Sequence, residues 1–456
     1  MSRILIAAND VVSTRMAGPG IRCFELGRQL RSAGHEVTVA GMEKSDLSAM
    51  DIEVTPPLST AAMDALARSY DAILLEGFAL VRYPSLRAVG VPLIVDLYDP
   101  FPLALLQQEA HRPAAERELG SERVLSALMD LLRVGDFFLC ASERQRDLWL
   151  GALLSAGRVN PDTWDRDETL RKLIDVVPFG VSEAPSPIRE VGYRDKMGPG
   201  IRGDDLVLLW GGGIYNWFDP LTLIRAVAAV TRRRPEVKLV FMSTTHPQRG
   251  VPERMWMPRR ARELADSLGV TGTQVIFHDG WVPYEERGSW LAAADAGVST
   301  HFDHAETRYA FRTRMLDYLW ARLPMICTEG DFFADLVRQK NLGWVVPPDD
   351  QAALERAIVE LADGDAGRSE MRSRVALVAS TMTWSRASPP LLRYCEHLKR
   401  AADASRLARA RQERPSAGRR RQRLAGLVRL GLRDLRTLGL VATARKAARW
   451  WRGRSH

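Results

Sequence analysis

The segment best suited to chemistry begins at residue 306 and reads ETRYAFRTRMLDYLWARLPMICTEGD. Its spacing predicts a helix that runs straight into a buried strand. Arg308, Arg312 and Arg314 place positive charge at the start of that helix, where the N-terminus already favours anions. Glu306 and Asp317 add carboxylates that can hold sugar or ribose hydroxyls. The layout therefore suits a phosphorylated sugar donor.

A purely structural interpretation of the same segment is equally open. Arg314 could pair with Asp317 about one turn further on, as residues three apart do on a helix surface. The apolar residues of the segment would then face a core: Phe311, Met315, Leu316 and Leu319. Spacing alone does not separate the two interpretations.

Two glycine-containing loops are candidate binding elements. MAGPGIR holds Gly18 and Gly20 just before a predicted helix, and Gly212 and Gly213 end a GGG run after a predicted buried strand. Glycine lets a backbone approach an anion closely, which suits phosphate or sugar contacts. About ten residues separate the first strand from Gly18, whereas a dinucleotide fingerprint needs an immediate turn, so an oxidoreductase is disfavoured. A plain loop and a simple tight turn remain alternatives.

Three further residues follow predicted strands. Trp281 and Val282 begin WVPYEER and offer an aromatic ring and backbone groups suited to a nucleobase edge, or a Trp that caps the core. Asp99, in DLYDP, could act on an acceptor hydroxyl or cap the following turn. HxxH at residues 301–304 lacks a third ligand, and the sequence has no HExxH, DxD, Walker or GxSxG motif. We therefore expect neither a metal nor a cofactor.

The elements that must position these residues repeat one pattern twice. Apolar strand candidates alternate with helical stretches in both halves, which predicts an α/β fold with parallel sheets. The first half has candidates at 4–8, 36–40, 72–76, 92–98 and 137–142, and the second at 206–213, 238–243, 274–280, 296–300, 324–330 and 343–348. Ligands of such sheets bind beyond the carboxyl ends of the strands. A site between the halves is therefore expected.

Domain boundaries follow from composition. We predict one α/β domain over 1–185 and a second α/β domain over 204–380. The Pro- and Gly-rich stretch 186–203 between them is interpreted as a linker. A helix over 381–400 is expected to pack back on the first domain, and 401–456 forms a basic tail.

Charge is divided unevenly along the 456 residues. Residues 399–456 contain 18 Lys or Arg and three acidic residues, a net charge of +15, while the preceding 398 residues contain 46 basic and 53 acidic residues, a net charge of −7. An acidic body repels a phosphate backbone, so no nucleic acid is expected as a partner. The four cysteines show no CxxC spacing, which disfavours zinc and a disulfide framework.

The tail has the composition of an interfacial helix. Leucines and a valine fall on one face over 424–438, with arginines opposite, and Trp450 and Trp451 follow. Three glycines oppose this helix, so disorder or an acidic partner are the alternatives. No apolar run is long enough to span a bilayer, and no signal sequence is evident. We therefore expect a cytoplasmic protein, peripheral on the inner face of the membrane through an anionic lipid surface.

Three motifs together resemble a known family. They are ELGRQLRSAGHEVTVA near the N-terminus, GGG after a strand, and an acidic segment that leads into LDYLWARLPMI. Over about residues 1–400 these resemble GT-B glycosyltransferases of the family-four (group 1) retaining type. That family carries a Glu, seven residues and a second Glu before a helix that ends in Gly-Leu-Pro. Here Asp317 stands at the second Glu, and Glu306 lies three residues out of register.

The resemblance implies two Rossmann-like, parallel-sheet domains that face each other across a cleft, an acceptor domain over 1–185 and a nucleotide-sugar domain over 204–380. It also implies transfer of a sugar with retention and without metal. Glu306 would hold the donor sugar, Asp317 the ribose, and Arg312 and Arg314 would replace a family Lys that IYNWFDP lacks. The motifs MAGPGIR and DLYDP resemble sequence motifs of enzymes of polysaccharide and O-antigen assembly. This resemblance implies a growing glycan or polyprenyl-linked acceptor. A sugar-nucleotide epimerase and a catalytically silent assembly scaffold are the alternatives.

Overall fold

The computed structural model describes residues 1–47, 52–190, 192–244, 246 and 255–407. The chain divides into two compact units, Met1–Ala402 and Asp403–His456, and the first contains both β-sheets. The amphipathic helix expected over 424–438 and the two tryptophans after it lie outside the described residues. Within the described part, no helix is both long and apolar enough to cross a bilayer.

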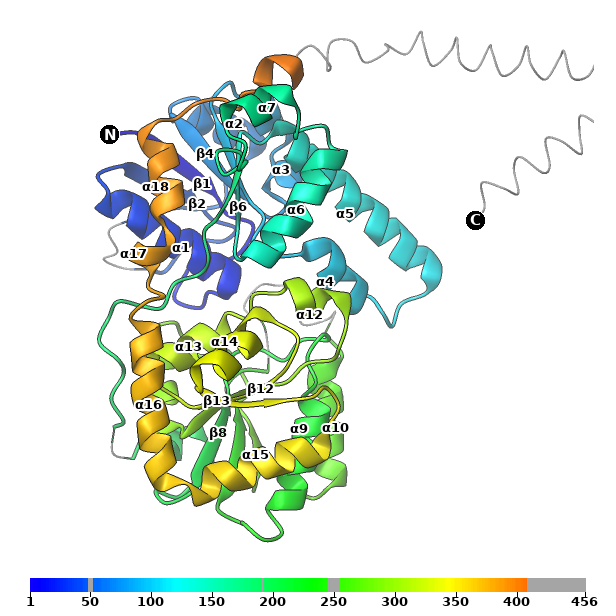
Figure 1. The fold of residues 1–456 in the computed structure, drawn as a ribbon, viewed down its shortest axis with the longest axis vertical. Coiled ribbons are helices and arrows are strands. Elements are labelled where there is room, and N and C mark those ends of the chain that lie inside the picture. Colours follow the sequence, from blue (N-terminus) through cyan, green and yellow to red (C-terminus); the bar gives the residue numbers. More distant parts are fainter. Residues whose placement is uncertain (48–51, 191, 245, 247–254, 408–456) are drawn as a thin grey trace, which may run out of the picture. The chain divides into compact units, whose positions relative to one another are not determined.

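The first half is a seven-stranded parallel sheet in the order β3-β2-β1-β4-β5-β6-β7 (Figure 1). Its strands are β1 Arg3–Ala7, β2 Glu36–Ala40, β3 Glu53–Thr55, β4 Ala72–Glu76, β5 Leu93–Asp96, β6 Phe137–Cys140 and β7 Ile174–Val176. The strands β1 and β4 to β6 are continuous apolar runs because helices cover both faces of the sheet. The edge strands β3 and β7, which the sequence did not predict, have only three residues each.

The helices of the first half are α1 Gly18–Ser32, α2 Thr60–Ala67, α3 Ala79–Arg82, the 3₁₀ turn Pro84–Ala88, α4 Phe101–Gln108, α5 Ala114–Val134, α6 Glu143–Ser155 and α7 Pro161–Arg166. Ser142 caps α6 by accepting a hydrogen bond from the backbone N–H of Gln145. The turn that follows β6 therefore fixes the start of α6 at the carboxyl edge of the sheet.

The second half is a six-stranded parallel sheet in the order β10-β9-β8-β11-β12-β13. Its strands are β8 Leu206–Trp210, β9 Val237–Phe241, β10 Val275–Phe277, β11 Ala296–Ser299, β12 Met325–Thr328 and β13 Gly343–Val346. Its helices are α9 Pro220–Val230, α10 Met257–Ser267, α11 Arg287–Ala293, α12 Ala305–Tyr309, α13 Arg314–Trp320, α14 Phe332–Lys340, α15 Gln351–Asp363 and α16 Asp365–Ala379. The predicted α/β class with two parallel sheets is confirmed.

The stretch 186–203 is anchored on the second half and includes a short helix, α8 Arg194–Met197. Arg194 is buried, donates to the carbonyl oxygens of Ala293 and Asp205, and pairs with Asp295 at 2.6 Å. Satisfied donors of this kind allow an arginine to be buried. The stretch interpreted as a linker thus contributes to the packing of the second half.

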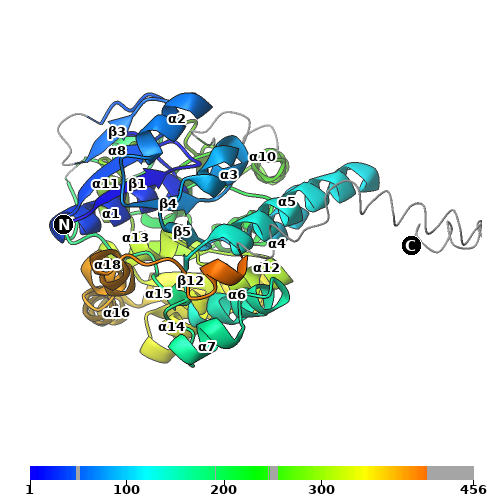
Figure 2. The same cartoon turned by 90° about the horizontal axis from the view of Figure 1, so that it is seen from above.

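The chain then returns to the first half after α16. Two helices, α17 Trp384–Ala387 and α18 Pro389–Glu396, follow, and α17 packs against α1 (Figures 1 and 2). Tyr394 of α18 stacks on Phe137 with ring centroids 4.4 Å apart. Arg400 Nε and the Ala401 N–H both donate to Asp136 Oδ1, at 2.9 and 2.8 Å. The contacts with the first sheet therefore continue to residue 401.

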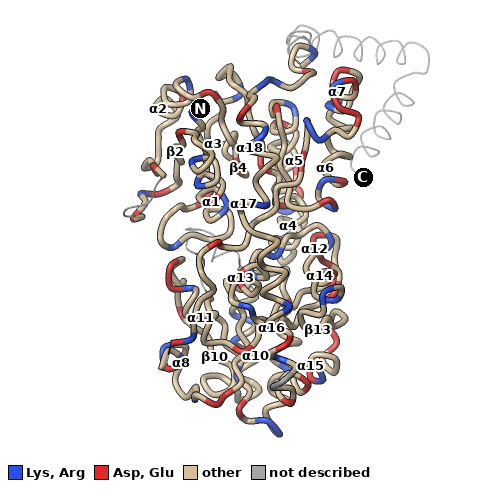
Figure 3. Tube along the Cα trace, turned by 60° about the vertical axis from the view of Figure 1, so that its left-hand side comes forward, with Lys and Arg blue, Asp and Glu red and all other residues tan. Residues whose placement is uncertain are grey.

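Along the Cα trace, Lys and Arg residues are interspersed with Asp and Glu residues in both halves (Figure 3). Residues 1–398 carry a net charge of −7.

Candidate active site

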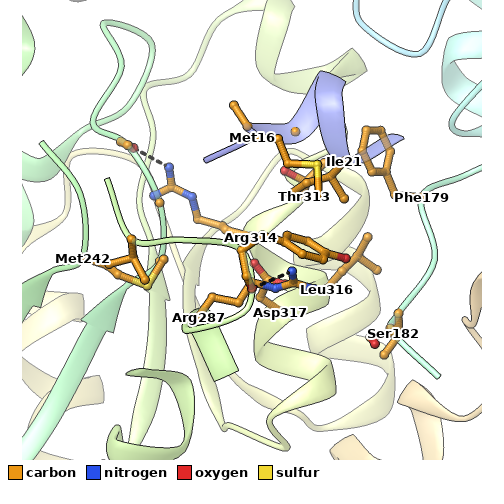
Figure 4. Close-up of a pocket in the computed structure, with 18 of the residues that line it drawn as sticks. Met16, Ile21, Phe179, Ser182, Met242, Arg287, Thr313, Arg314, Leu316 and Asp317 are labelled. Atoms are coloured by element: carbon orange, nitrogen blue, oxygen red, sulfur yellow. Dashed lines mark hydrogen bonds and ion pairs between the residues drawn. The ribbon is translucent and has the colours of Figure 1, made fainter. Parts of the chain in front are cut away.

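Two adjoining cavities lie between the loop before α1 and the start of α13. The first, an open cavity of about 870 Å³, is lined by Gly18, the Gly211–Gly213 turn, Trp281 and Val282, among others. Figure 4 shows Arg314, Leu316 and Asp317 of α13 in its lining. The second, an open cavity of about 1120 Å³, is lined by Arg312 and by carboxylates and aromatic rings, among them Asp10, Tyr98, Asp99, Trp217, Phe218 and Glu306. Gly18, Tyr215, Thr313 and Arg314 line both cavities. The two spaces are therefore parts of one region at the carboxyl edges of both sheets.

The glycine turn after β8 is shaped by contacts on either side of it. Gly212 has φ +92°, a left-handed conformation that glycine adopts without strain, and a Cβ there would meet open space. The N–H of Gly211 donates to the Tyr318 hydroxyl at 2.8 Å, and Tyr318 lies in α13. The turn and α13 are therefore held together at the floor of the first cavity.

Arg314 is a buried cation beside this turn. Its Nη2 donates to the carbonyl oxygen of Gly213 at 2.8 Å, and its guanidinium lies over Phe218 and Trp210, 4.1 and 4.5 Å from their ring centroids. Its Nη1 has no hydrogen-bond partner among the described residues. Burial lowers the pKa of Arg314 to about 10, so the side chain is still positive at neutral pH. A buried cation with a free donor is suited to an anionic ligand.

Asp317 has a different partner from the one that the structural interpretation of the sequence assigned. The expected Arg314–Asp317 pair was wrong, because Asp317 Oδ1 accepts from Arg287 Nε at 3.2 Å and Arg314 turns to Gly213. The apolar residues that this interpretation assigned to a core are buried in one: Phe311, Met315, Leu316 and Leu319. Arg287 in turn lies 3.6 Å from the ring centroid of Tyr284. Burial raises the pKa of Asp317, and the charge of Arg287 opposes that rise. Asp317 lines the first cavity, and its ribose-binding role stays a prediction.

The segment from residue 306 forms two helices, so the prediction of one continuous helix was wrong. The side chain of His304 caps α12, which ends at Tyr309, and Ala310 is extended with φ −69° and ψ 147°. The break inserts Phe311 among aromatic rings, 4.8 Å from Phe333 and 5.4 Å from Phe332 between ring centroids. Burial of these rings favours the break over continuation of the helix.

Glu306 and Arg312 lie on either side of that break and form a buried ion pair. Arg312 Nη1 donates to Glu306 Oε1 at 2.9 Å, and Nη2 donates to Oε2 at 2.6 Å. Both side chains line the second cavity. Two parallel bonds fix the plane of the carboxylate as well as its position. Arg312 is thus engaged by a carboxylate, which leaves Arg314 as the free cation of the two predicted phosphate-binding arginines.

Acidic residues converge on the same cavity from the first half. Asp99 follows β5, and burial followed by the charge of Glu306 raises its pKa to about 7. Asp10 follows β1, and burial raises its pKa to about 7 as well. Asp96, at the end of β5, is paired with the buried Arg22, whose Nη2 lies 2.9 Å from Asp96 Oδ1. Asp99 and Asp10 are therefore the carboxylates of this edge that line the cavity.

The two predicted glycines of the first loop have different surroundings. Gly18 lines both cavities, and a Cβ there would lie 3.5 Å from Thr313 Oγ1. A Cβ on Gly20 would lie 2.1 Å from the carbonyl oxygen of Val11, so Gly20 permits close packing within the first half. Gly20 is not among the residues that line either cavity.

Trp281 and Val282 both line the first cavity. The N–H of Val282 faces Ser243 Oγ at 3.5 Å, and the Trp281 ring lies 5.5 Å from that of His246. The two cavities thus contain every predicted site residue except Gly20 and Arg308, and Arg308 is exposed. The sequence analysis missed Asp10, Tyr215 and Arg287, although an acidic residue shortly after β1 was a signal for the first of them.

Two parallel α/β halves with a shared region at their carboxyl edges define the GT-B fold of glycosyltransferases. Solved structures with this fold match nearly the whole chain. A sucrose-phosphate synthase from Thermosynechococcus elongatus is 16% identical with a TM-score of 0.59, over 87% of this chain and 98% of the other. HepE from Anabaena, solved with UDP and glucose, is 14% identical with a TM-score of 0.61, over 87% and 100%.

A third structure is WaaG, a glycosyltransferase involved in lipopolysaccharide biosynthesis. It is 14% identical with a TM-score of 0.60, over 88% of this chain and 98% of its own. Residues 205–364 match the family model described as glycosyl transferases group 1. The second half is therefore similar to the domain that this family model describes. No curated protein matches the chain.

Proposed function

We propose that this protein is a glycosyltransferase that moves a sugar from a nucleotide-diphosphate donor to a growing surface glycan or lipid-linked acceptor. The observation that carries the proposal is Arg314, a buried cation with an unpartnered Nη1 where the two cavities meet. A leaving diphosphate needs its developing negative charge stabilised, and a preorganised guanidinium does this in a site shielded from water. The match to the group 1 family model and the UDP and glucose bound by HepE support the same donor class.

In the proposed reaction, the nucleotide and the transferred sugar would occupy different cavities. The nucleotide would occupy the first cavity with its base near Trp281 and Val282 and its ribose near Asp317. The diphosphate would lie between Arg314 and the turn at Gly212 and Gly213. The transferred sugar would then reach the second cavity, where Glu306 would hold it.

Transfer with retention needs no strong protein base. The bond between the anomeric carbon and the diphosphate oxygen breaks, and the acceptor oxygen bonds to that carbon on the same face. The departing phosphate oxygen receives the acceptor proton. Asp99 would orient the acceptor hydroxyl from the first half. In this scheme no metal or cofactor is required, because Arg314 supplies the positive charge.

The surface-glycan acceptor and the membrane location are supported more indirectly. WaaG, which has the same fold, is involved in lipopolysaccharide biosynthesis. The net charge of +15 over residues 399–456 would attract an anionic leaflet and bring the enzyme to a polyprenyl-linked acceptor on the inner face of the membrane.

A panel of nucleotide sugars tests the proposal. We expect nucleotide-diphosphate sugars to raise the Tm, because a ligand that binds only the folded state stabilises it. The stabilising donor is then incubated with and without lipid-linked acceptors, and products are separated by chromatography. A glycosylated acceptor supports the proposal. An isomerised donor without glycan product would show an epimerase instead, and absence of any nucleotide binding by calorimetry would contradict catalysis.

A further inference from the structure

Gln145 is a buried amide with partners in both halves of the chain. It lies in the first turn of α6 and is fully buried. Its Nε2 donates to the carbonyl oxygen of Tyr98 at 2.6 Å and to that of Tyr309 at 2.8 Å. Its Oε1 accepts from the N–H of Ala141 at 2.7 Å. One side chain therefore joins the first half to the second through backbone atoms.

The two carbonyl groups bound by Gln145 belong to segments that carry the predicted site carboxylates. Tyr98 directly precedes Asp99, and both line the second cavity. Tyr309 is the last residue of α12, the helix that carries Glu306. Arg312 follows three residues after Tyr309. The helix α12 packs against α4 and α6 of the first half. The Gln145 amide thus fixes the position of the Asp99 segment relative to the Glu306 segment.

A second contact from the same turn of α6 reaches the second half near the surface. Arg144 pairs with Asp335 and donates to the carbonyl oxygen of Gly330 at 3.3 Å. Both partners of that ion pair are more than a third exposed, and exposed pairs contribute little. The buried amide is a different case, because a donor left without a partner in such a place is costly.

We infer that Gln145 is a positioning residue: its amide holds the two halves together at the second cavity and sets Asp99 in register with Glu306. When the halves separate, the N–H that meets Tyr309 would have to find water, while the bonds to Tyr98 and Ala141 remain within the first half. The amide therefore favours the arrangement in which both carboxylates line one cavity. Only the expected loss of kcat/KM rests on the proposed function, and the expected change in distance between the halves does not.

The chain offers a matched control for the test. Asn160 is also an amide that bridges backbone groups, since Nδ2 donates to the carbonyl oxygens of Gly157 and Arg158 and Oδ1 accepts from the N–H of Asp162 and Thr163. All of these groups lie in the first half. Asn160→Ala thus removes these four hydrogen bonds, which lie within the first half.

The experiment measures the distance between the halves in the full-length protein. Spin labels are placed at the exposed Ser32→Cys and Ser267→Cys, which is selective because Cys23, Cys140, Cys327 and Cys395 are all buried. Pulsed electron resonance then gives the distance distribution for the parent, Gln145→Met, Gln145→Glu and Asn160→Ala. Methionine keeps the volume without donors, and an ionised glutamate keeps an acceptor without donors.

We expect both Gln145 variants to shift the distribution to longer distances, with Asn160→Ala unchanged. With an active donor, kcat/KM of Gln145→Met should fall about 100-fold, the size of effect that a misplacement near 1 Å produces, while the Kd for nucleoside diphosphate changes little. Unchanged distances in both Gln145 variants, or an equal shift in Asn160→Ala, would overturn the inference. A protein without nucleotide binding would refute the proposed function, and the distances would still decide the role of Gln145.

Discussion

Arg312 binds both carboxylate oxygens of Glu306, at 2.9 and 2.6 Å, and both side chains are at least 95% buried. The predicted sugar-binding carboxylate is therefore held by one of the two arginines predicted to bind phosphate. Removal of one partner of such a pair leaves an uncompensated buried charge.

This pair predicts a non-additive stability cycle. Arg312→Met and Glu306→Gln should each lower the free energy of unfolding by about 3 to 5 kcal/mol, and the double variant should lose clearly less than the sum. Urea unfolding of the four proteins measures the cycle. Arg259→Met serves as the control, since Arg259 faces Glu263 at 3.8 Å on the exposed surface of α10 and should change stability little. Strictly additive losses would mean that the pair does not act as a unit.

Arg314 should distinguish the diphosphate from the nucleoside. Arg314→Met keeps packing over Phe218 and Trp210 but removes the cation, so the Kd for nucleoside diphosphate should rise at least about tenfold, or about 1.4 kcal/mol. Binding of the nucleoside alone should be unaffected, as titration calorimetry can show. Arg308→Met, at an exposed position of α12, is the matched control. Equal losses for both ligands would remove Arg314 from the phosphate site.

Glu76 should make stability depend on pH in a definite direction. Burial raises its pKa from 4.5 to about 8, and the N–H of Asn9 donates to its Oε2 at 2.7 Å. The folded protein therefore keeps a proton that the unfolded chain releases between pH 4.5 and about 8. Its contribution to stability is fully present below pH 4.5 and is lost as pH rises through that window.

Glu76→Gln removes this titration while it keeps the shape and the acceptor. Relative to the parent, the variant should gain more than about 1.4 kcal/mol, the value of one pKa unit, between pH 4 and pH 8.5. Chemical unfolding at the two pH values gives the difference. A stability difference between variant and parent that is independent of pH would show that Glu76 titrates normally.

The two glycines of the MAGPGIR loop should respond differently to alanine. Gly20→Ala places a Cβ 2.1 Å from the Val11 carbonyl oxygen and should lower the free energy of unfolding by about 2 kcal/mol or more through overpacking. In Gly18→Ala, the atom nearest to the new Cβ is Thr313 Oγ1 at 3.5 Å, so the fold should tolerate this variant. The space that the two cavities share at residue 18 should become narrower. Thermal unfolding and nucleotide binding, measured together, separate the two effects. Loss of stability in Gly18→Ala alone would reverse this assignment.

The basic tail should be separable from the body if the chain is cut after Leu407. Arg400 and Ala401 bind Asp136 of the first half, and Asp403 is fully buried, so an earlier cut would also remove packing contacts. A protein that ends at Leu407 should keep its Tm and nucleotide binding but no longer sediment with vesicles that contain anionic lipid. Neutral vesicles are the control, because the expected attraction is electrostatic. Undiminished sedimentation of the truncated protein would refute membrane binding through the tail.

Local sequence features were sufficient to predict the fold and most of the residues that line the two cavities. Apolar runs such as residues 72–75 and 206–210 predicted both parallel sheets, because strands covered on two faces are largely apolar. The edge strands β3 and β7 were missed, since three residues carry too little pattern. The GGG turn and the acidic segment before LDYLWARLPMI indicated residues that line the cavities, because these motifs are local in the chain.

The tertiary structure alone decided which charged groups pair. Arg312 and Arg314 have the same charge and lie two residues apart, yet the break after Tyr309 turns the first to Glu306 and the second to Gly213. Asp10 and Asp99 come to one cavity from strands far apart in sequence, and Gln145 reaches Tyr309 across 164 residues. Such pairings depend on burial and on the meeting of distant segments, which raise or lower the free energy of a charge by several kcal/mol. Sequence spacing contains no measure of either quantity, so residue types identified the site while packing assigned its partners.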